Sequence, residues 1–173
     1  WENPTVDLIP LFATIPDLEA SEEVMRALFS DPIYKAHLER RKMKQTIMLG
    51  FSDGTKDGGY FMANWSIYVA KERLSKLASS FRIQIAFFDG RGGPPARGGG
   101  NTHEFYACMG DTIQSDDIQL TIQGQTISSN FGTLDSSQYN LEQLLSSGIE
   151  NQIFNPGENN LTDEERYLME DIA

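Results

Sequence analysis

Residues 83–103 of this chain read IQIAFFDGRGGPPARGGGNTH, and the first six form an apolar run typical of a buried strand. The remainder holds six of the chain's 15 glycines and two arginines, Arg91 and Arg97. Glycine lets a ligand approach the main chain, and arginine offers a planar, permanent charge to carboxylate or phosphate. The stretch therefore predicts an anion-binding loop at the carboxyl end of a strand. A flexible surface loop is the alternative, because neither phosphate-binding glycine spacing, GxxxxGK[ST] or GxGxxG, is present.

Strands and helices alternate along the chain up to this loop. Pro10 lies in the first apolar run, and since proline donates no ladder hydrogen bond, that strand is expected at a sheet edge or bulged near its end. Asp31 before Pro32 is typical of a helix start. The polar residues 51–58 are expected to form a loop. The expected strands cover residues 6–12, 44–50 and 83–88, and the expected helices cover 16–29, 32 to about 40, 60–80 and 102–109.

The pattern changes after residue 110. Residues 118–122 and 126–128 are expected to form a broken strand or a small hairpin. A helix is expected over 136–147, with Gly148 as its C-cap, followed by a linker over 155–160. Thr162 with Glu165 forms a capping-box pattern that predicts a last helix.

This alternation predicts an α/β fold with parallel βα units, whose ligand-binding groups collect at the carboxyl ends of the strands. A chain of 173 residues is long enough for one domain with its own core. An eight-stranded barrel takes about 250 residues, so the chain is either a small open sheet or part of a barrel. It begins without methionine and in mid-pattern, as a piece of a larger protein does.

The composition excludes several classes of protein. A net charge of −11 argues against nucleic acid or an anionic membrane as a partner. No apolar run is long enough to span a membrane, and no signal peptide is visible. The single cysteine, Cys108, excludes an internal disulfide and is expected in the core. We therefore expect a cytoplasmic protein. Of its two histidines, His37 is expected at the surface, and His103 to cap a helix or contact the loop.

Two blocks of the chain resemble phosphoenolpyruvate carboxylase. They are FDGRGGPPARGGGNTH, residues 88–103, and MLGFSDGTKDGGY, residues 48–60. The resemblance runs from about residue 7 to residue 148. It implies that residues 1–173 are a single fragment of a (β/α)8 TIM-type barrel, with βα units over 1–150 and a linker and helix start over 151–173.

The resemblance also implies a reaction. Enzymes of this family convert phosphoenolpyruvate and bicarbonate to oxaloacetate and phosphate with Mg²⁺ or Mn²⁺, and they are typically homotetramers. Asp53 matches a metal ligand, Lys56 a lysine of the site, and Arg91 an arginine that holds substrate or carboxyphosphate. Arg97, with Gly98 and Gly99, lies in a mobile loop that also binds aspartate as an inhibitor. From the residues alone, an ordinary solvated turn is the alternative for Asp53 and Lys56.

The chain departs from the family pattern at three positions. Ala13 stands in place of a glutamate that binds the metal, Asp89 in place of a histidine, and Ile122 in place of a glutamate. The family's catalytic histidine segment has no match here, so the isolated chain is expected to be inactive. Two other hypotheses remain: a non-catalytic domain derived from the barrel that binds aspartate, phosphate or phosphoenolpyruvate, and an unrelated open α/β domain.

Overall fold

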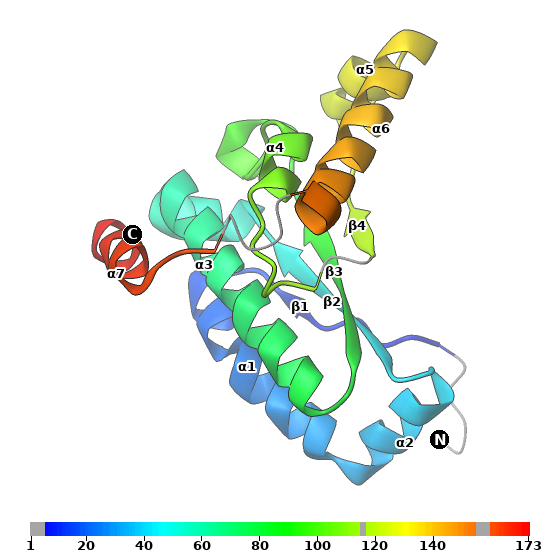
Figure 1. Ribbon diagram of the computed structural model, residues 1–173, viewed down its shortest axis with the longest axis vertical. Coiled ribbons are helices and arrows are strands. Elements are labelled where there is room, and N and C mark those ends of the chain that lie inside the picture. The colour runs from blue at the N-terminus through cyan, green and yellow to red at the C-terminus, as the bar shows by residue number, and fades with distance from the viewer. Residues whose placement is uncertain (1–5, 115–116, 155–159) are drawn as a thin grey trace.

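The computed structural model describes residues 6–114, 117–154 and 160–173, and its centre is a four-stranded parallel sheet in the order β1-β2-β3-β4 (Figure 1). β2 and β3 pair along their whole length, from Lys44 opposite Gln84 to Gly50 opposite Gly90. The short β1 is an edge strand, as Pro10 predicted, and the carbonyl of Pro10 accepts a hydrogen bond from the Met48 amide. The predicted α/β class with parallel units is therefore confirmed. The strands are β1 (Leu11–Phe12), β2 (Lys44–Gly50), β3 (Gln84–Gly90) and β4 (Ile118–Leu120).

Two helices begin where the capping patterns predict, after Asp31 and after Thr162, and Thr14 caps α1 although no cap was predicted there. Thr14 and Thr162 each form a capping box, and the Asp31 side chain accepts from the amides of Ile33 and Tyr34. The helices are α1 (Ile15–Ser30), α2 (Pro32–Arg40), α3 (Ser52–Ser80), α4 (Thr102–Ala107), α5 (Gln125–Phe131), α6 (Leu134–Ile149) and α7 (Asp163–Ile172), with a 3-10 turn η1 (Pro95–Arg97) and a π-helical turn η2 (Glu150–Phe154).

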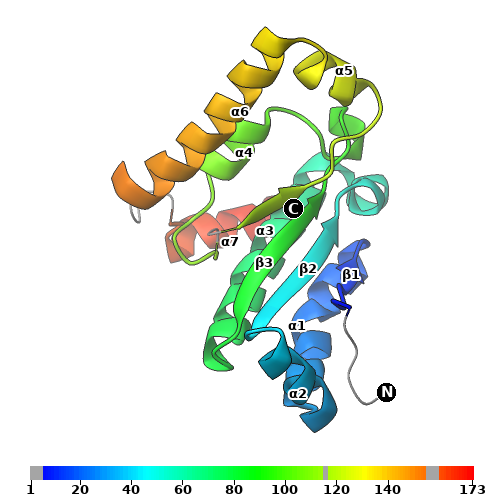
Figure 2. The same ribbon diagram turned by 90° about the vertical axis from the view of Figure 1, so that its right-hand side faces the viewer.

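Helices α1 and α3 cover one face of the sheet, and none of the described helices crosses the other face over β2 and β3 (Figure 2). Alternate residues of the two strands, Ile47 and Leu49 of β2 and Ile85 and Phe87 of β3, are buried in the apolar core with α1 and α3. α4, α5 and α6 lie beyond the carboxyl ends of the strands, whereas α2 lies near their amino ends (Figure 1). The carboxyl ends of the strands, where ligand-binding groups are predicted to collect, therefore lie next to α4 and α6.

Four expectations about secondary structure are wrong. The strand expected over residues 6–12 covers only Leu11–Phe12. Residues 51–58 are not a loop: Phe51 is fully buried, and its carbonyl accepts from the Thr55 amide to begin α3. Residues 126–128 belong to α5, because Gly124 (φ 60°) turns the chain directly into a helix. Gly148 does not cap α6, which continues to Ile149, since Gly148 is not among the glycines with positive φ. The expected linker over 155–160 lies, apart from residue 160, outside the described residues.

Two expectations about burial are also wrong. Cys108 is exposed at the end of α4, where its thiol donates to the Phe105 carbonyl. His37 is 5% exposed, because the face of α2 that carries Tyr34 and His37 packs toward the sheet. Among the described residues, we find no helix with the length and apolar character that a bilayer crossing requires.

Candidate anion-binding site

Arg91 follows β3 directly and is held in place by its surroundings. It is 4% exposed, and its Nε donates to the carbonyl of Gly98 at 3.0 Å. Its guanidinium lies 4.2 Å from the ring centroid of Phe105 and 5.7 Å from that of Phe51. Burial lowers the pKa of Arg91, and the nearby Tyr106 and Asp89 oppose this effect. Such stacking on aromatic rings suits the weakly hydrated guanidinium group, which stays charged in proteins.

One donor of Arg91 is left unused. Its Nη1 is buried and has no hydrogen-bond partner in the described part of the chain. A buried charged donor without a partner is costly and calls for an explanation. An anion that accepts a hydrogen bond from Nη1 would supply one.

The glycine loop is closed by its own backbone. The Gly92 amide donates to the Arg97 carbonyl, and the Gly99 amide donates to the Pro94 carbonyl, each at 2.9 Å. The Gly99 carbonyl accepts a hydrogen bond from the Tyr60 hydroxyl at 3.2 Å. The loop is therefore folded into a compact turn and joined to α3.

Gly98 and Gly99 have conformations or surroundings that exclude a side chain. Gly98 has φ 72°, and an added Cβ would lie 2.3 Å from the Cβ of Phe51. At Gly99 an added Cβ would lie 1.9 Å from the carbonyl oxygen of Gly93. The positive φ and the Phe51 side chain thus explain Gly98, and close approach of backbone to backbone explains Gly99.

Arg97 shares this loop with Arg91 but is arranged differently. Its backbone closes the turn, whereas its side chain is exposed and has no partner among the residues that the structure describes. The loop therefore carries one fixed, buried cation and one free, exposed cation.

Asp53 and Lys56 lie in the first turn of α3 and bind each other. Lys56 Nζ is 2.8 Å from Asp53 Oδ1, and the two side chains are 67% and 52% exposed. An exposed pair of this kind contributes only about 0–1 kcal/mol, so a ligand can replace it at little cost. In the described chain, no hydrogen bond or ion pair joins Asp53 or Lys56 to Arg91 or Arg97.

The predicted metal site fits this chain only in part. Ala13 lies next to the Asp53 turn, because its carbonyl accepts from the Gly54 amide at 3.1 Å, and its methyl group faces Gly50. The alanine side chain offers no oxygen, which leaves Asp53 as the one predicted carboxylate here. No group of three or more metal-binding side chains occurs within the described ranges. The residues present do not form a complete site for a divalent cation.

A buried ion pair, which the sequence did not predict, lies behind the loop. Asp89 is 1% exposed, and Lys71 Nζ lies 2.8 and 2.9 Å from its two carboxylate oxygens. The Tyr106 hydroxyl donates to Asp89 Oδ2 at 2.7 Å. Burial lowers the pKa of Lys71, an effect that Asp89 opposes, and burial raises the pKa of the Tyr106 hydroxyl. The negative charge that Asp89 brings to this anion site is therefore balanced by Lys71.

A signal for this pair was present in the sequence. Lys71 is four residues after Ile67 and three before Leu74, so helical spacing places it on the apolar face of α3. An aspartate at the end of an apolar strand needs a buried partner, and a lysine on that face can supply it.

A buried arginine and a compact glycine loop at the carboxyl edge of a parallel sheet are typical of α/β enzyme domains that bind small anions. The family model of phosphoenolpyruvate carboxylase matches residues 2–173, and the chain belongs to this family. This excludes the hypothesis of an unrelated α/β domain.

Curated relatives agree with the family match. A phosphoenolpyruvate carboxylase from Corynebacterium glutamicum is 38% identical over 99% of this chain and 19% of its own length. Those from Corynebacterium efficiens and Corynebacterium diphtheriae are 40% and 36% identical, over 86% and 97% of the chain and 16% and 19% of their own lengths. The chain thus spans about a fifth of the length of these relatives.

Proposed function

We propose that this chain is the anion-binding part of a phosphoenolpyruvate carboxylase barrel, and that the intact protein makes oxaloacetate and phosphate from phosphoenolpyruvate and bicarbonate. The proposal is supported by the family match and by the position of Arg91 at the carboxyl edge of the sheet. A purely parallel sheet is normally covered on both faces. The open face over β2 and β3 is therefore consistent with a TIM-type barrel that further strands and helices complete.

Each cation has a distinct proposed role. Arg91 holds the phosphate or carboxyphosphate group, because its stacked guanidinium needs no reorganisation before it binds. Lys56 gives up its exposed pair with Asp53 to place a point charge on the second substrate. Arg97, with the amides of Gly98 and Gly99, closes on the substrate or on inhibitory aspartate. The observation that carries the proposal is the buried, unused Nη1 of Arg91.

Replacing Arg91 by lysine tests this role. A lysine keeps the charge but loses the bond to the Gly98 carbonyl and the ring stacking, so we expect affinity for phosphoenolpyruvate to fall about tenfold or more. Calorimetric titration of the chain measures the affinity, and kcat/KM of the intact protein measures the consequence. Arg73→Lys, at an exposed position of α3, is the matched control. Equal affinities of the unaltered chain, Arg91→Lys and Arg73→Lys for phosphoenolpyruvate would contradict the proposed role of Arg91.

A divalent cation, Mg²⁺ or Mn²⁺, is the cofactor that we propose for the intact protein. This chain would supply only Asp53, and further oxygens would come from substrate and water, as Mg²⁺ accepts. The homotetramer, the cytoplasmic location and the division of the chain near residue 150 remain predictions.

Ala13→Glu tests whether the metal site is otherwise formed. The Ala13 carbonyl accepts from the Gly54 amide, so a carboxylate at position 13 would start beside the turn that carries Asp53. We expect this variant to bind Mn²⁺ about tenfold more tightly than the unaltered chain, measured by titration, and more tightly still with phosphoenolpyruvate. Ala13→Gln has the same size without the charge and should bind less. If neither variant binds, the chain does not form the site.

A second candidate function is non-catalytic binding of aspartate or phosphate by a domain derived from the barrel. The absence of a carboxylate at Ala13 is the observation that favours it. Carboxylation of phosphoenolpyruvate by the intact protein, with alanine retained at this position, would exclude it.

A further inference from the structure

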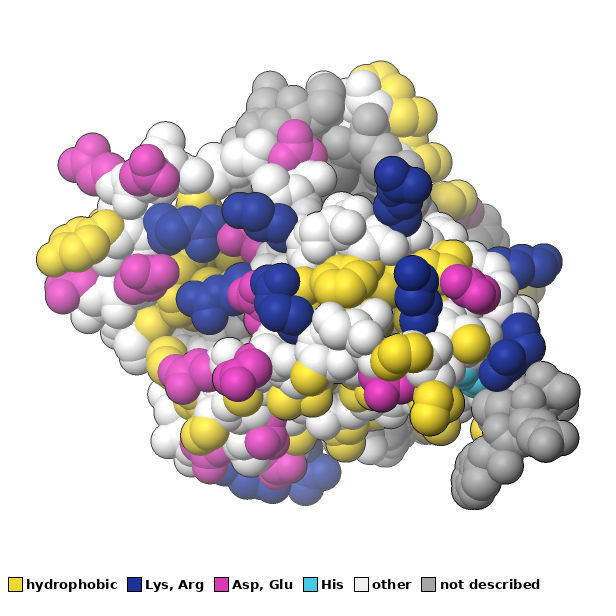
Figure 3. Space-filling model, turned by 90° about the horizontal axis from the view of Figure 1, so that it is seen from below, with side chains coloured by type: hydrophobic (Ala, Val, Ile, Leu, Met, Phe, Trp, Pro, Cys, Tyr) yellow, Lys and Arg dark blue, Asp and Glu magenta, His cyan; other side chains and the backbone are white. Residues whose placement is uncertain are grey.

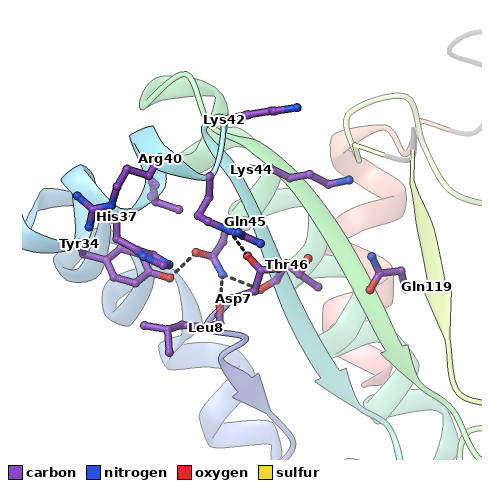
Figure 4. Close-up of a pocket in the computed structure, with 12 residues that line it drawn as sticks. Asp7, Leu8, Tyr34, His37, Arg40, Lys42, Lys44, Gln45, Thr46 and Gln119 are labelled. Atoms are coloured by element: carbon purple, nitrogen blue, oxygen red, sulfur yellow. Dashed lines mark hydrogen bonds and ion pairs between the residues drawn. The ribbon is translucent and has the colours of Figure 1, made fainter. Parts of the chain in front are cut away.

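A cavity lies at the amino ends of the strands (Figure 4), at the opposite end of the sheet from Arg91. It has a volume of about 320 Å³, within the range of small-ligand sites. α2, the segment before β1 and the start of β2 form most of its wall. Its lining residues are Asp7, Leu8, Tyr34, His37, Leu38, Arg40, Arg41, Lys42, Lys44, Gln45, Thr46 and Gln119.

The wall of this cavity carries an excess of positive charge. Four cationic side chains and one carboxylate line it. Arg41 pairs with Asp7, and Lys44 pairs with Asp117. Arg40 and Lys42 are exposed and have no ion-pair partner in the described part of the chain. In Figure 3, lysine and arginine side chains lie interspersed with aspartate and glutamate over the face seen from below. The whole chain has a net charge of −11.

The end of α2 explains only part of this excess. A helix C-terminus carries about half a negative charge, and basic residues in its last turn commonly balance it. Arg40 and Lys42 together exceed that demand, and both pairs, Arg41 with Asp7 and Lys44 with Asp117, are already neutral. The remaining positive charge is available to a ligand.

His37 is the second observation that points to a ligand. It is 5% exposed and lines the cavity, and its Nδ1 is buried without a hydrogen-bond partner among the described residues. Its ring lies 5.8 Å from that of Tyr34. Buried ring nitrogens normally have a partner. A ligand oxygen at this position would provide one.

The polar groups next to His37 are already satisfied. The Tyr34 hydroxyl donates to Gln45 Oε1, and Gln45 Nε2 donates to the carbonyls of Leu8 and Thr46 (Figure 4). Gln45 is 2% exposed, so this group forms a fixed floor beneath the cavity. Among the cationic and imidazole side chains of the described lining, His37, Arg40 and Lys42 have no ion-pair partner.

We propose that this cavity binds the phosphate group of a small phosphate monoester. Arginine forks, lysine ammonium groups and imidazole all bind phosphate oxygens, and a phosphate has three terminal oxygens for three donors. A monocarboxylate has two oxygens and half the charge. The volume leaves room for a small group attached to the phosphate. This site is separate from the Arg91 loop and does not rest on the proposed carboxylase reaction.

The backbone at Lys42 provides a variant that removes one cation without loss of stability. Lys42 has φ 57° and Met43 has φ 54°, in the left-handed region that disfavours side chains. Glycine adopts this conformation without strain. We therefore expect Lys42→Gly to raise the melting temperature by about 2–4 °C while it removes a ligand of the phosphate. Calorimetry of the folded chain measures this shift.

The experiment uses the two histidines as separate reporters. In the 173-residue chain labelled with ¹⁵N-histidine, His37 reports on this cavity and His103, in the first turn of α4, reports on the glycine loop. Inorganic phosphate, glycerol 3-phosphate and succinate are titrated in turn. We expect saturable shifts of the His37 signal with both phosphates, and tighter binding of glycerol 3-phosphate. Succinate should bind weakly or not at all.

Variants assign the binding to this cavity. Lys42→Gly and Arg40→Gln should each weaken the phosphate effect on His37 about tenfold, and Arg97→Gln should leave it unchanged. A His37 signal that does not move, that moves equally in Lys42→Gly, or that responds only to succinate would overturn the proposal. Loss of the His37 response in the intact protein would also overturn the proposal, because another part of that protein would then occupy the cavity. A response at His103 alone would support the loop site and overturn this one.

Discussion

Asp89→Ala is expected to lower the free energy of unfolding by about 3–5 kcal/mol, because it leaves the Lys71 ammonium buried without its counter-charge. Lys71 and Asp89 are 2% and 1% exposed, so water cannot replace the lost carboxylate. The Tyr106 hydroxyl loses its acceptor at the same time. Urea denaturation of the chain, followed by circular dichroism, measures the change.

The pH dependence separates a lost charge partner from a lost contact. Burial already lowers the pKa of Lys71 below its usual 10.5, and removal of Asp89 lowers it further. Between the lowered pKa and 10.5, the unfolded chain binds more protons than the folded chain, so stability rises with pH in that window. The destabilisation of Asp89→Ala should therefore shrink at alkaline pH. A penalty independent of pH would point to a packing defect.

A double variant is the matched control for the ion pair. Lys71→Met with Asp89→Asn removes both charges and keeps an oxygen for the Tyr106 hydroxyl. Replacing a buried pair by groups of similar volume is often neutral or stabilising, so we expect it to recover most of the stability. If the double variant is as unstable as Asp89→Ala, the charge of Lys71 is not the cause.

Gly98→Ala is expected to reduce affinity for phosphoenolpyruvate about 100-fold, because the glycine loop can no longer close on Phe51. The added Cβ meets Phe51 at 2.3 Å, and φ 72° disfavours any side chain. The Gly98 carbonyl must then move, and Arg91 Nε loses its acceptor. Titration calorimetry with phosphoenolpyruvate measures the loss.

Gly148→Ala is the control for this change. Gly148 lies in α6 with no atom within 4 Å of an added Cβ, so alanine there should raise stability by about 0.5–1 kcal/mol and leave binding unchanged. An unchanged affinity of Gly98→Ala would mean that loop closure on Phe51 is not needed for the anion.

Local patterns were sufficient to predict most of the secondary structure. The apolar runs located β2 and β3 within one or two residues, and the Asp31-Pro32 pair located the start of α2, because these signals act between neighbouring residues. The prediction of a loop over residues 51–58 was wrong because burial of Phe51 overrides the weak helix propensity of this segment. The prediction of a strand over residues 126–128 was wrong because its β-branched side chains have no neighbouring strand to pair with among the described residues.

The candidate site was predictable only where its residues share a motif. Arg91 and Arg97 were found through the glycine loop. The Lys71–Asp89 pair was missed because its members are 18 residues apart and meet only when α3 packs on β3. His37 was assigned to the surface from its charged neighbours, although it shares the buried face of α2 with Tyr34. Contacts between elements depend on packing, which periodicity alone does not reveal.

Gly59 gives α3 a hinge. With φ 85° and ψ 175°, it adopts a conformation that is essentially restricted to glycine, and an added Cβ would meet nothing within 4 Å. The turn that carries Asp53 and Lys56 therefore need not move with the long part of α3, whereas Tyr60, the next residue, is bonded to the glycine loop. A ligand that contacts Lys56 and Arg97 together would set the angle at this hinge, and so transmit closure of the loop to the Asp53 turn.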